Sequence, residues 1–387
     1  MRKVALVSAD QSRFGEFGSM GIKELFQEAY RETLEGLDYP LEGRRIQAAY
    51  IGSLGVGGFQ LGQSAPLLTT HLGLGAIPSV RVENACASGG YALLEAIRAV
   101  ASGEHDLVLA AGVEKMRDMS SSKGRYWLGV SGDTEYERLA GLTFAGIYAL
   151  MASRYMHEYG AKKRHLAMVA VKNHANGVKN PKAHMRKAIS LEQAMAAPNV
   201  AWPLGLFDCS LTSDGAACAL VAPLEMAIEF TKKPVAVVGY GAASDHLAVH
   251  DREVVTSLGA SVEAGRRAMA MAGMGPGDIQ VAEVHDCFTI AEILAYEDLG
   301  FCARGQAPRL LEEGFTLNGG RVAVNPSGGL KSKGHPLGAT GVAQAAEIFH
   351  QLRDECGARQ VKGAHTGLSH NVGGSGGSAS VVIYQRA

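Results

Sequence analysis

The two ends of the sequence repeat one another. Residues 3–8 (KVALVS) resemble residues 234–239 (PVAVVG), and residues 46–51 (IQAAYI) resemble residues 279–284 (IQVAEV). Each half alternates short apolar strands with helices, a pattern that predicts an α/β fold with a largely parallel sheet. A duplicated α/β unit brings two sets of strand ends together, and catalytic loops are expected where those ends meet.

The stretch between the halves, roughly residues 115–205, is more helical and more polar, with an apolar-faced helix predicted from Thr143 to His157. Residues 154–187 hold nine Lys and Arg side chains against one acid, Glu158. Two interpretations stay open: a solvated helical face, or a pocket for a polyanionic small molecule, because Lys and Arg supply charge-assisted donors to phosphates. Candidate ligands in the second case are Lys179, Arg186 and Lys187.

Charge and cysteine usage narrow the class of protein. The net charge is −1, from 37 basic and 38 acidic residues, which argues against nucleic acid or an anionic membrane as the main partner. No segment offers the ~20 apolar residues that span a bilayer, and the first residues resemble a strand rather than a signal peptide. Six widely spaced cysteines without a CxxC pair predict reduced thiols in the cytoplasm and no zinc site.

Cys86 lies at a predicted turn between the strand 79–83 and the helix 91–102. A thiol at a helix N-terminus feels the positive end of the macrodipole and nearby unpaired N–H groups. Both favour the thiolate, which is the nucleophilic form. Gly89 and Gly90 are expected to clear space for an approaching substrate. The alternative is a buried structural cysteine, which is common in cytosolic proteins.

Three further segments are predicted to be active-site loops. His285, Asp286 and Cys287 follow an apolar strand, although a turn with a buried cysteine is the simpler interpretation. Residues 325–341 (NPSGGLKSKGHPLGATG) join a strand to a helix and carry His335, which can act as a base toward a thiol. Residues 369–377 (SHNVGGSGG) are expected to form a loop between strands, where a Gly-rich backbone can supply N–H groups to an oxyanion.

These segments, in this order and within a duplicated chain, resemble the thiolases. The resemblance covers essentially the whole chain, and the NPSGGLKSKGHPLGATG stretch is its most specific part. The HDCF and HN motifs are more similar to sterol-carrier-protein-2-type and archaeal-type thiolases than to the common biosynthetic ones. The resemblance implies two thiolase halves in a five-layered αβαβα body. It divides the chain into an N-terminal half (1–117 and 206–230), a loop domain for coenzyme A (118–205) and a C-terminal half (231–387).

The resemblance also implies roles for individual residues. Cys86 would be the nucleophile that becomes acylated, and His335 would activate it and help bind the thioester oxygen. Cys287 would be the second acid/base, and His285 would replace the Asn that holds an oxyanion-hole water. The N–H groups of Cys86 and Gly373 would form a second oxyanion hole. Coenzyme A would be a co-substrate, with no metal and no prosthetic group.

One position departs from the common pattern. The usual Cys of the last motif falls on Asn371, which cannot transfer protons near neutral pH. The proton-transfer role therefore passes to Cys287, with His370 as a possible helper.

The alternatives left open are a β-ketoacyl synthase, a thiolase-like retro-aldol lyase and a non-catalytic lipid-transfer or scaffold subunit. The resemblance further implies a homodimer or tetramer and a possible small OB-fold, zinc-containing partner. The activity that the resemblance implies is reversible cleavage of a 3-oxoacyl-CoA by coenzyme A, whose reverse is Claisen condensation. Acetoacetyl-CoA competes with longer or aromatic 3-oxoacyl-CoAs as the substrate. We name Trp127, Leu128, Phe144, Met151 and Trp202 as candidate pocket residues.

Overall fold

A single mixed sheet runs through the molecule. The structure is a computed structural model that describes residues 1–41 and 46–387. In this part of the chain ten strands form one sheet in the order β10-β9-β11-β12-β8-β1-β7-β4-β2-β3. Their bounds are β1 Val4–Gln11, β2 Ala48–Gly52, β3 Ser79–Val82, β4 Val108–Glu114, β7 Gly215–Pro223, β8 Val235–Ser244, β9 Val281–Glu283, β10 Ala323–Val324, β11 Thr366–Gly373 and β12 Ser378–Arg386. A separate pair consists of β5 Asn199–Ala201 and β6 Leu204–Gly205.

The two repeats meet edge to edge at β1 and β8, which pair antiparallel with Leu6 opposite Val235. The prediction of a largely parallel sheet is wrong. Only β2 with β3 and β4, and β9 with β10 and β11, run parallel. The reason is clearest at β11 and β12, which only four residues separate. A connection that short permits only an antiparallel hairpin.

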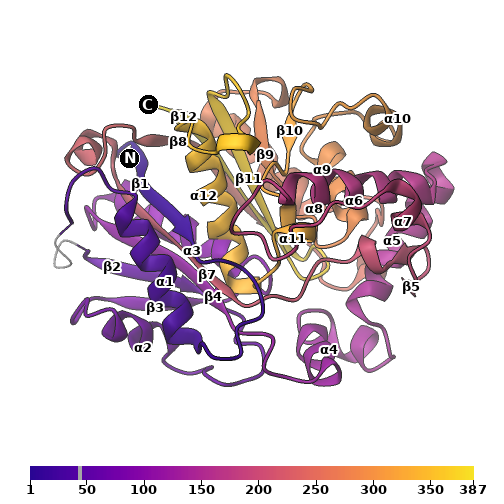
Figure 1. The fold of residues 1–387 in the computed structure, drawn as a ribbon, viewed down its shortest axis with the longest axis horizontal. Helices are drawn as coiled ribbons and strands as arrows, with labels where there is room; N and C mark the ends of the chain where they lie inside the picture. Colours follow the sequence, from indigo (N-terminus) through magenta and orange to yellow (C-terminus); the bar gives the residue numbers. More distant parts are fainter. Residues whose placement is uncertain (42–45) are drawn as a thin grey trace.

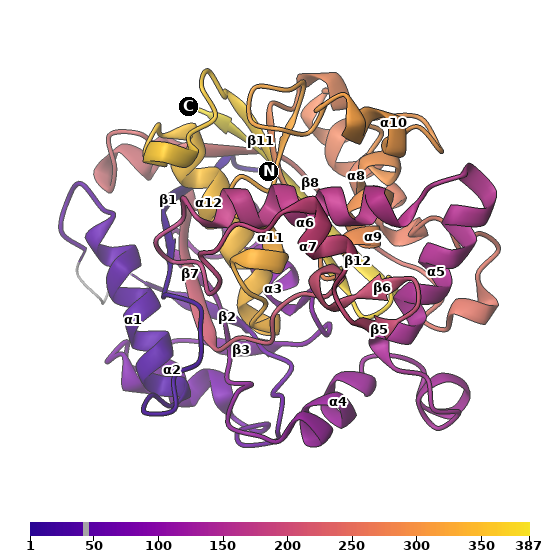
Figure 2. The same cartoon turned by 45° about the vertical axis from the view of Figure 1, so that its right-hand side comes forward.

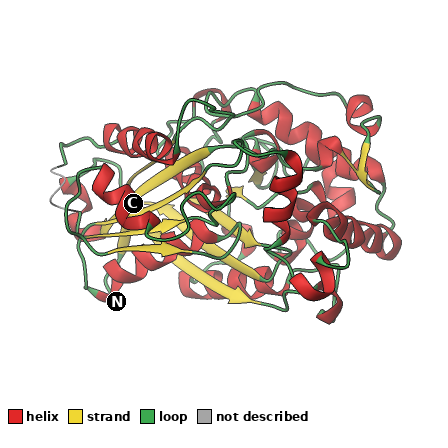
Figure 3. Ribbon diagram, turned by 90° about the horizontal axis from the view of Figure 1, so that it is seen from below, coloured by secondary structure: helices red, strands yellow, loops and turns green. Residues whose placement is uncertain are grey.

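Helices cover both faces of the strands and fill the space between the two repeats, as Figures 1 and 3 show. The helices are α1 Ile22–Glu35, α2 Ser64–His71, α3 Ser88–Ser102, α4 Ser121–Gly129, α5 Phe144–Tyr159, α6 Lys163–Gly177, α7 Leu191–Met195, α8 Gly259–Ala272, α9 Thr289–Asp298, α10 Ala307–Glu312, α11 Gly329–Ser332 and α12 Thr340–Leu352.

The central layer consists of α3 and α12, which contact each other and strands of both repeats. Helix α1 packs on the outer face of β1 and β7, and α8 packs on the outer face of β8 and β12. This arrangement is the five-layered αβαβα body expected from the sequence. All but one residue of α12 is buried, because the helix is enclosed between the two halves of the sheet. Its buried polar side chains are hydrogen-bonded, as Gln344 is to the His370 carbonyl.

The segment that connects the repeats lies against the C-terminal one (Figure 2). Both α5 and α6 contact α9, and α6 also contacts α10 and α11. The helix predicted from Thr143 to His157 is present as α5, and the Thr143 hydroxyl caps it by accepting from the Gly146 N–H. Within the described residues, no helix has the length and apolar character that crossing a membrane requires.

Candidate active site

Cys86 lies in a strained turn between β3 and α3, as the sequence predicted. The residue before it, Ala85, has a φ of 50°, a left-handed conformation that costs a non-glycine residue free energy. Ser88 closes the turn, because its hydroxyl donates to the Ala85 carbonyl (2.6 Å) and accepts from the Asn84 N–H (2.9 Å). The turn holds the Cys86 thiol at the first residues of α3, where only 7% of the residue is exposed.

Gly89 and Gly90 do not clear space for a substrate, contrary to the expectation. A Cβ on Gly89 would lie 2.4 Å from the main-chain oxygen of Gly338, and a Cβ on Gly90 would lie 2.9 Å from Oδ1 of Asn371. These glycines allow the start of α3 to contact the backbone at the start of α12. The contact therefore fixes the Cys86 turn against the loop that carries His335.

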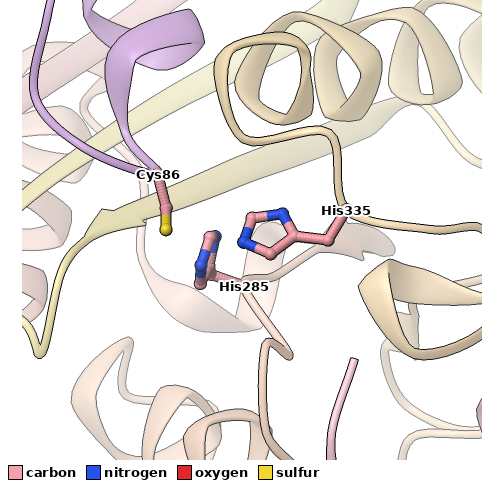
Figure 4. Close-up of side chains that lie close together, drawn as sticks. All are labelled: Cys86, His285 and His335. Atoms are coloured by element: carbon pink, nitrogen blue, oxygen red, sulfur yellow. The ribbon is translucent and has the colours of Figure 1, made fainter. Parts of the chain in front are cut away.

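Three side chains from distant parts of the sequence converge on one point. One ligand atom each from Cys86, His285 and His335 lie within 4.8 Å of one another, and all three residues are buried. The two imidazole rings meet edge to face, with centroids 5.1 Å apart. Figure 4 shows both rings beside the Cys86 sulfur. A thiol flanked by two imidazoles can exchange protons, and the same set could also hold a metal ion.

His335 is oriented by Thr340, one turn into the same segment. The Thr340 hydroxyl donates to the Pro336 carbonyl (2.9 Å), so its oxygen accepts from His335 Nδ1, at 2.7 Å. Since a neutral imidazole carries one proton, Nε2 of His335 keeps a lone pair. Burial lowers the pKa of His335 to about 3. His335 is therefore a neutral base at ordinary pH.

Burial also raises the pKa of the Cys86 thiol, to about 12. Hydrogen bonds from the N–H groups of Gly374 and of Cys86 itself lower this pKa, but by less than burial raises it. From the sequence we expected the helix terminus to lower the pKa of Cys86, and this expectation is wrong because burial has the larger effect. At neutral pH the site holds a thiol and a neutral imidazole rather than an ion pair. Were Cys86 to attack an electrophile, its proton would have to pass to a neighbouring base such as His335. The glycine N–H that lowers the Cys86 pKa belongs to Gly374, next to Gly373, whose predicted part in an oxyanion hole stays a prediction.

Cys287 has a neighbour that no motif indicated. Burial raises the pKa of Cys287 well above its usual value, the nearby Cys86 adds to the rise, and a hydrogen bond with Tyr148 opposes it. Tyr148 belongs to α5; its ring stacks on Phe288 at 4.6 Å and its hydroxyl donates to the Gly374 carbonyl at 3.1 Å. On the sequence, Tyr148 is one residue of an apolar-faced helix, and nothing in that pattern distinguishes it.

His370 faces away from the thiol. Residues 369–373 are part of β11 rather than a loop, and consecutive side chains of a strand point to opposite faces. Asn371 accepts from the Gly90 N–H and donates to the Cys86 carbonyl, whereas Nε2 of His370 bonds the hydroxyl of Ser261 on α8, at 2.8 Å. Burial lowers the pKa of His370 to about 3. The suggested help of His370 in proton transfer is therefore not supported by its position.

A cavity of about 450 Å³ opens beside His335. Of the candidate pocket residues, Leu128 and Phe144 line it, together with Arg125, Cys209 and Thr212. The other three candidates lie elsewhere: Trp127 packs on the cluster around Cys86, Met151 is fully buried in the core and Trp202 is 67% exposed.

The basic segment 154–187 does not act as one patch. Lys172 is buried in an ion pair with Glu292, and Lys182 pairs with Asp10 and Glu32. The candidate ligands Lys179, Arg186 and Lys187 are exposed and are not among the residues that line the cavity. The basic residue that does line it, Arg125, lies outside the segment that the sequence analysis singled out.

Buried acids hold the loops in place. The Glu114 carboxylate at the end of β4 accepts from the N–H groups of Leu54, Gly55, Val56 and Gly338. The Asp286 carboxylate accepts from the N–H groups of Leu330 and Lys331 at the start of α11. Asp286, the middle residue of the HDC sequence, thus has a structural role beside its two neighbours in the site.

This fold, with a buried thiol beside two imidazoles, is that of a class of acyl-transferring enzymes. The family models for the N-terminal domain of thiolase and for the thiolase C-terminal domain match residues 4–200 and 241–386. The chain belongs to the thiolase family, the acyltransferases that act on coenzyme A thioesters.

Named relatives agree with this assignment. An acetyl-CoA acetyltransferase of Methanothermobacter thermautotrophicus is 48% identical over 387 residues, which is the whole of both chains. Human sterol carrier protein 2 is 35% identical over all of this chain and 72% of its own length. Among solved structures, an Ltp2-ChsH2(DUF35) aldolase superposes with a TM-score of 0.87 at 25% identity, over 99% of this chain and 98% of that one.

Proposed function

We propose that this thiolase cleaves a short 3-oxoacyl-CoA with coenzyme A, and forms it in the reverse Claisen condensation, with acetoacetyl-CoA as the substrate. The observation that carries the proposal is the meeting of Cys86, His285 and His335 within 4.8 Å. The whole-length similarity to an archaeal acetyl-CoA acetyltransferase supports the acetyl group.

The first half-reaction makes an acyl-enzyme. Cys86 Sγ attacks the 3-keto carbon while its proton passes to Nε2 of His335. The N–H groups of Cys86 and Gly373 receive the developing oxyanion, while the Gly374 N–H lowers the pKa of the thiol. The bond between C2 and C3 then breaks. This leaves an acyl thioester on Cys86 and the enolate of acetyl-CoA, whose thioester oxygen faces a ring N–H of His285.

Cys287 completes the proton balance. Its thiol protonates C2 of the enolate, and acetyl-CoA leaves. The resulting Cys287 thiolate takes the proton of the incoming coenzyme A thiol, and that sulfur attacks the acyl–Cys86 thioester. Acyl-CoA departs, and Cys86 recovers its proton from His335. No metal or prosthetic group takes part in this sequence of steps.

The cavity beside His335 is the proposed entry for the pantetheine arm. Its lining comes from residues 125–145 and 200 of the loop domain, and from residues 209–212 of the N-terminal half. The domain division at residues 117, 205 and 230 is part of this proposal. We also propose a homo-oligomeric state and a cytoplasmic location. The six free cysteines favour the cytoplasmic location, because thiols stay reduced there.

A second candidate rests on the similarity to the Ltp2-ChsH2(DUF35) aldolase, in which Ltp2 is paired with a DUF35 protein. In that case this chain would need a small partner protein, or would catalyse a retro-aldol step instead. A retro-aldol reaction has no use for a thiol nucleophile, so the buried Cys86–His335 pair favours thiolysis. The variant Cys86→Ala tests the choice: it should abolish thiolysis of acetoacetyl-CoA, and unchanged turnover would exclude the acyl-enzyme mechanism.

A further inference from the structure

Asn371 makes three hydrogen bonds at the centre of the site. Its Oδ1 accepts from the Gly90 N–H at 3.1 Å, its Nδ2 donates to the Cys86 carbonyl at 3.0 Å, and Nδ2 also lies 3.1 Å from His285 Nδ1. The residue is 2% exposed. A main-chain N–H on one side and a carbonyl on the other allow only one orientation of the amide, with the NH2 group toward His285.

This orientation determines where His285 carries its proton. An amide NH2 donates only, so Nδ1 of His285 must accept and cannot bear the hydrogen. Burial and the neighbouring His335 and His370 lower the pKa of His285 well below its usual value, which keeps the ring neutral with a single proton. That proton is therefore on Nε2. Among the described residues, Nε2 of His285 is buried and has no hydrogen-bond partner.

We propose that Asn371 is a positioning residue that fixes His285 as the Nε2–H tautomer, so that this N–H donates to the thioester oxygen of the substrate. The inference rests on the proposed function for the identity of that oxygen. Thr340 fixes His335 in the opposite tautomer, with the lone pair on Nε2. The two buried histidines beside the thiol thus have different roles. His335 accepts a proton, and His285 donates a hydrogen bond.

The same amide makes the trio a poor metal site. Zinc bound by Cys86, His285 and His335 would need a lone pair on Nε2 of each imidazole. For His285 this moves the proton to Nδ1. The Nδ1–H would then face the NH2 group of Asn371, and two hydrogen-bond donors facing each other repel. Asn371 thus protects a nucleophile that would otherwise be a zinc ligand.

The tautomer can be observed in the unmodified protein. In long-range ¹H–¹⁵N spectra of histidine-labelled protein, protonated and unprotonated ring nitrogens have well-separated shifts, and His285→Gln and His335→Gln identify the signals. We expect a protonated Nε2 in His285 and a protonated Nδ1 in His335. A protonated Nδ1 in His285 would overturn the proposal. The spectrum does not depend on whether Cys86 becomes acylated. The tautomer proposal and the proposed function can therefore be refuted independently of each other.

Substitution tests the consequence. In Asn371→Asp one carboxylate oxygen still accepts from the Gly90 N–H, and the other accepts a hydrogen bond from Nδ1–H of His285, which inverts the tautomer. The hydrogen bond to the Cys86 carbonyl is lost. Loss of an oxyanion donor should lower kcat about 10²- to 10³-fold with KM for coenzyme A unchanged. A carboxylate behind a histidine strengthens its metal binding, so the affinity for Zn²⁺ alone should rise about 10-fold or more, measured by competition with a chelating dye.

Asn180→Ala is the matched control. The Asn180 amide also bonds two main-chain groups, Ser327 O and Lys182 N, and its loss should change stability without changing Zn²⁺ affinity. If Asn371→Asp binds Zn²⁺ no better than wild type, or if Asn180→Ala gains the same affinity, the proposal is wrong. Asn371→Ala, which leaves His285 without a partner at Nδ1, should fall between wild type and Asn371→Asp in both measurements.

Discussion

Replacement of Thr340 by valine tests whether His335 is the base. Valine has the shape of threonine and tolerates the same helical rotamer, but it cannot accept the hydrogen bond from Nδ1 of His335, now 2.7 Å long. The ring would then hold a buried N–H without a partner, which costs about 1–3 kcal/mol. Moving the proton to Nε2, beside the Cys86 sulfur, offers the N–H a weak acceptor in place of none, and so favours that tautomer.

The kinetic effect follows from the proton on Nε2. With Nε2 protonated, His335 has no lone pair for the Cys86 proton, and the thiol, whose pKa is about 12, cannot ionise by itself at neutral pH. General-base catalysis contributes about 10²- to 10⁴-fold to a rate, so acylation of Cys86 should slow by about that factor.

The assay is the single-turnover rate of acetylation of Cys86 by acetyl-CoA, followed by rapid quench and mass spectrometry. Thr340→Ser keeps the hydroxyl and should acylate within a few-fold of wild type. If Thr340→Val acylates as fast as Thr340→Ser while both remain folded, His335 does not act through the tautomer that Thr340 holds, and the assignment of the base is refuted.

Three other predictions follow from the contacts described above. The rate of Cys86 acetylation should not change between pH 5 and pH 9. His335, with a pKa of about 3, is neutral at pH 5 and above, and the Cys86 thiol, with a pKa of about 12, is still protonated at pH 9. A bell-shaped profile centred near pH 7 would indicate an ion pair instead. The single hydroxyl hydrogen of Tyr148 is donated to the Gly374 carbonyl at rest and turns to Cys287 when that thiol ionises, which lowers the Cys287 pKa. Tyr148→Phe keeps the ring on Phe288 but removes this donor, and since a hydrogen bond to a charged group contributes about 1.5–3 kcal/mol, exchange of the acetyl-CoA methyl protons should slow at least about 10-fold while Cys86 acetylation is unaffected. Equal loss in both steps would speak against a role through Cys287. Gly89→Ala would bring a Cβ to 2.4 Å from the Gly338 oxygen and should lower the free energy of unfolding by about 1–3 kcal/mol in urea titrations, whereas Gly62→Ala, where a Cβ meets nothing within 4 Å, serves as the control that should not.

The local parts of the site could be predicted because they depend on neighbours in the sequence. A strand, a small turn and a helix around Cys86 are visible in the order of apolar residues and glycines, and the turn is present. The approach of His285 and His335 to Cys86 follows from the duplication, since equivalent strand ends of two joined repeats meet. No residue pattern, however, shows that burial outweighs the helix terminus at Cys86.

Other features depend on packing that the sequence does not express. Tyr148 reaches Cys287 only because α5 packs on α9, and an apolar helix face gives no sign of which of its residues touches a site. His370 was misplaced for a different reason. The glycines after it suggested a loop, but residues 366–373 are a strand, and alternation along that strand places Asn371 in the site and His370 outside it.

The central claim is that Cys86 carries the acyl group. Intact-mass and peptide mass spectrometry after brief incubation with acetoacetyl-CoA, quenched in acid, measures it directly. The account predicts one acetyl group per chain, on the peptide that contains Cys86, absent in Cys86→Ala and retained in a Cys287→Ala variant loaded from acetyl-CoA. An acetyl group on Cys287 or Cys209 with Cys86 unmodified would contradict the mechanism.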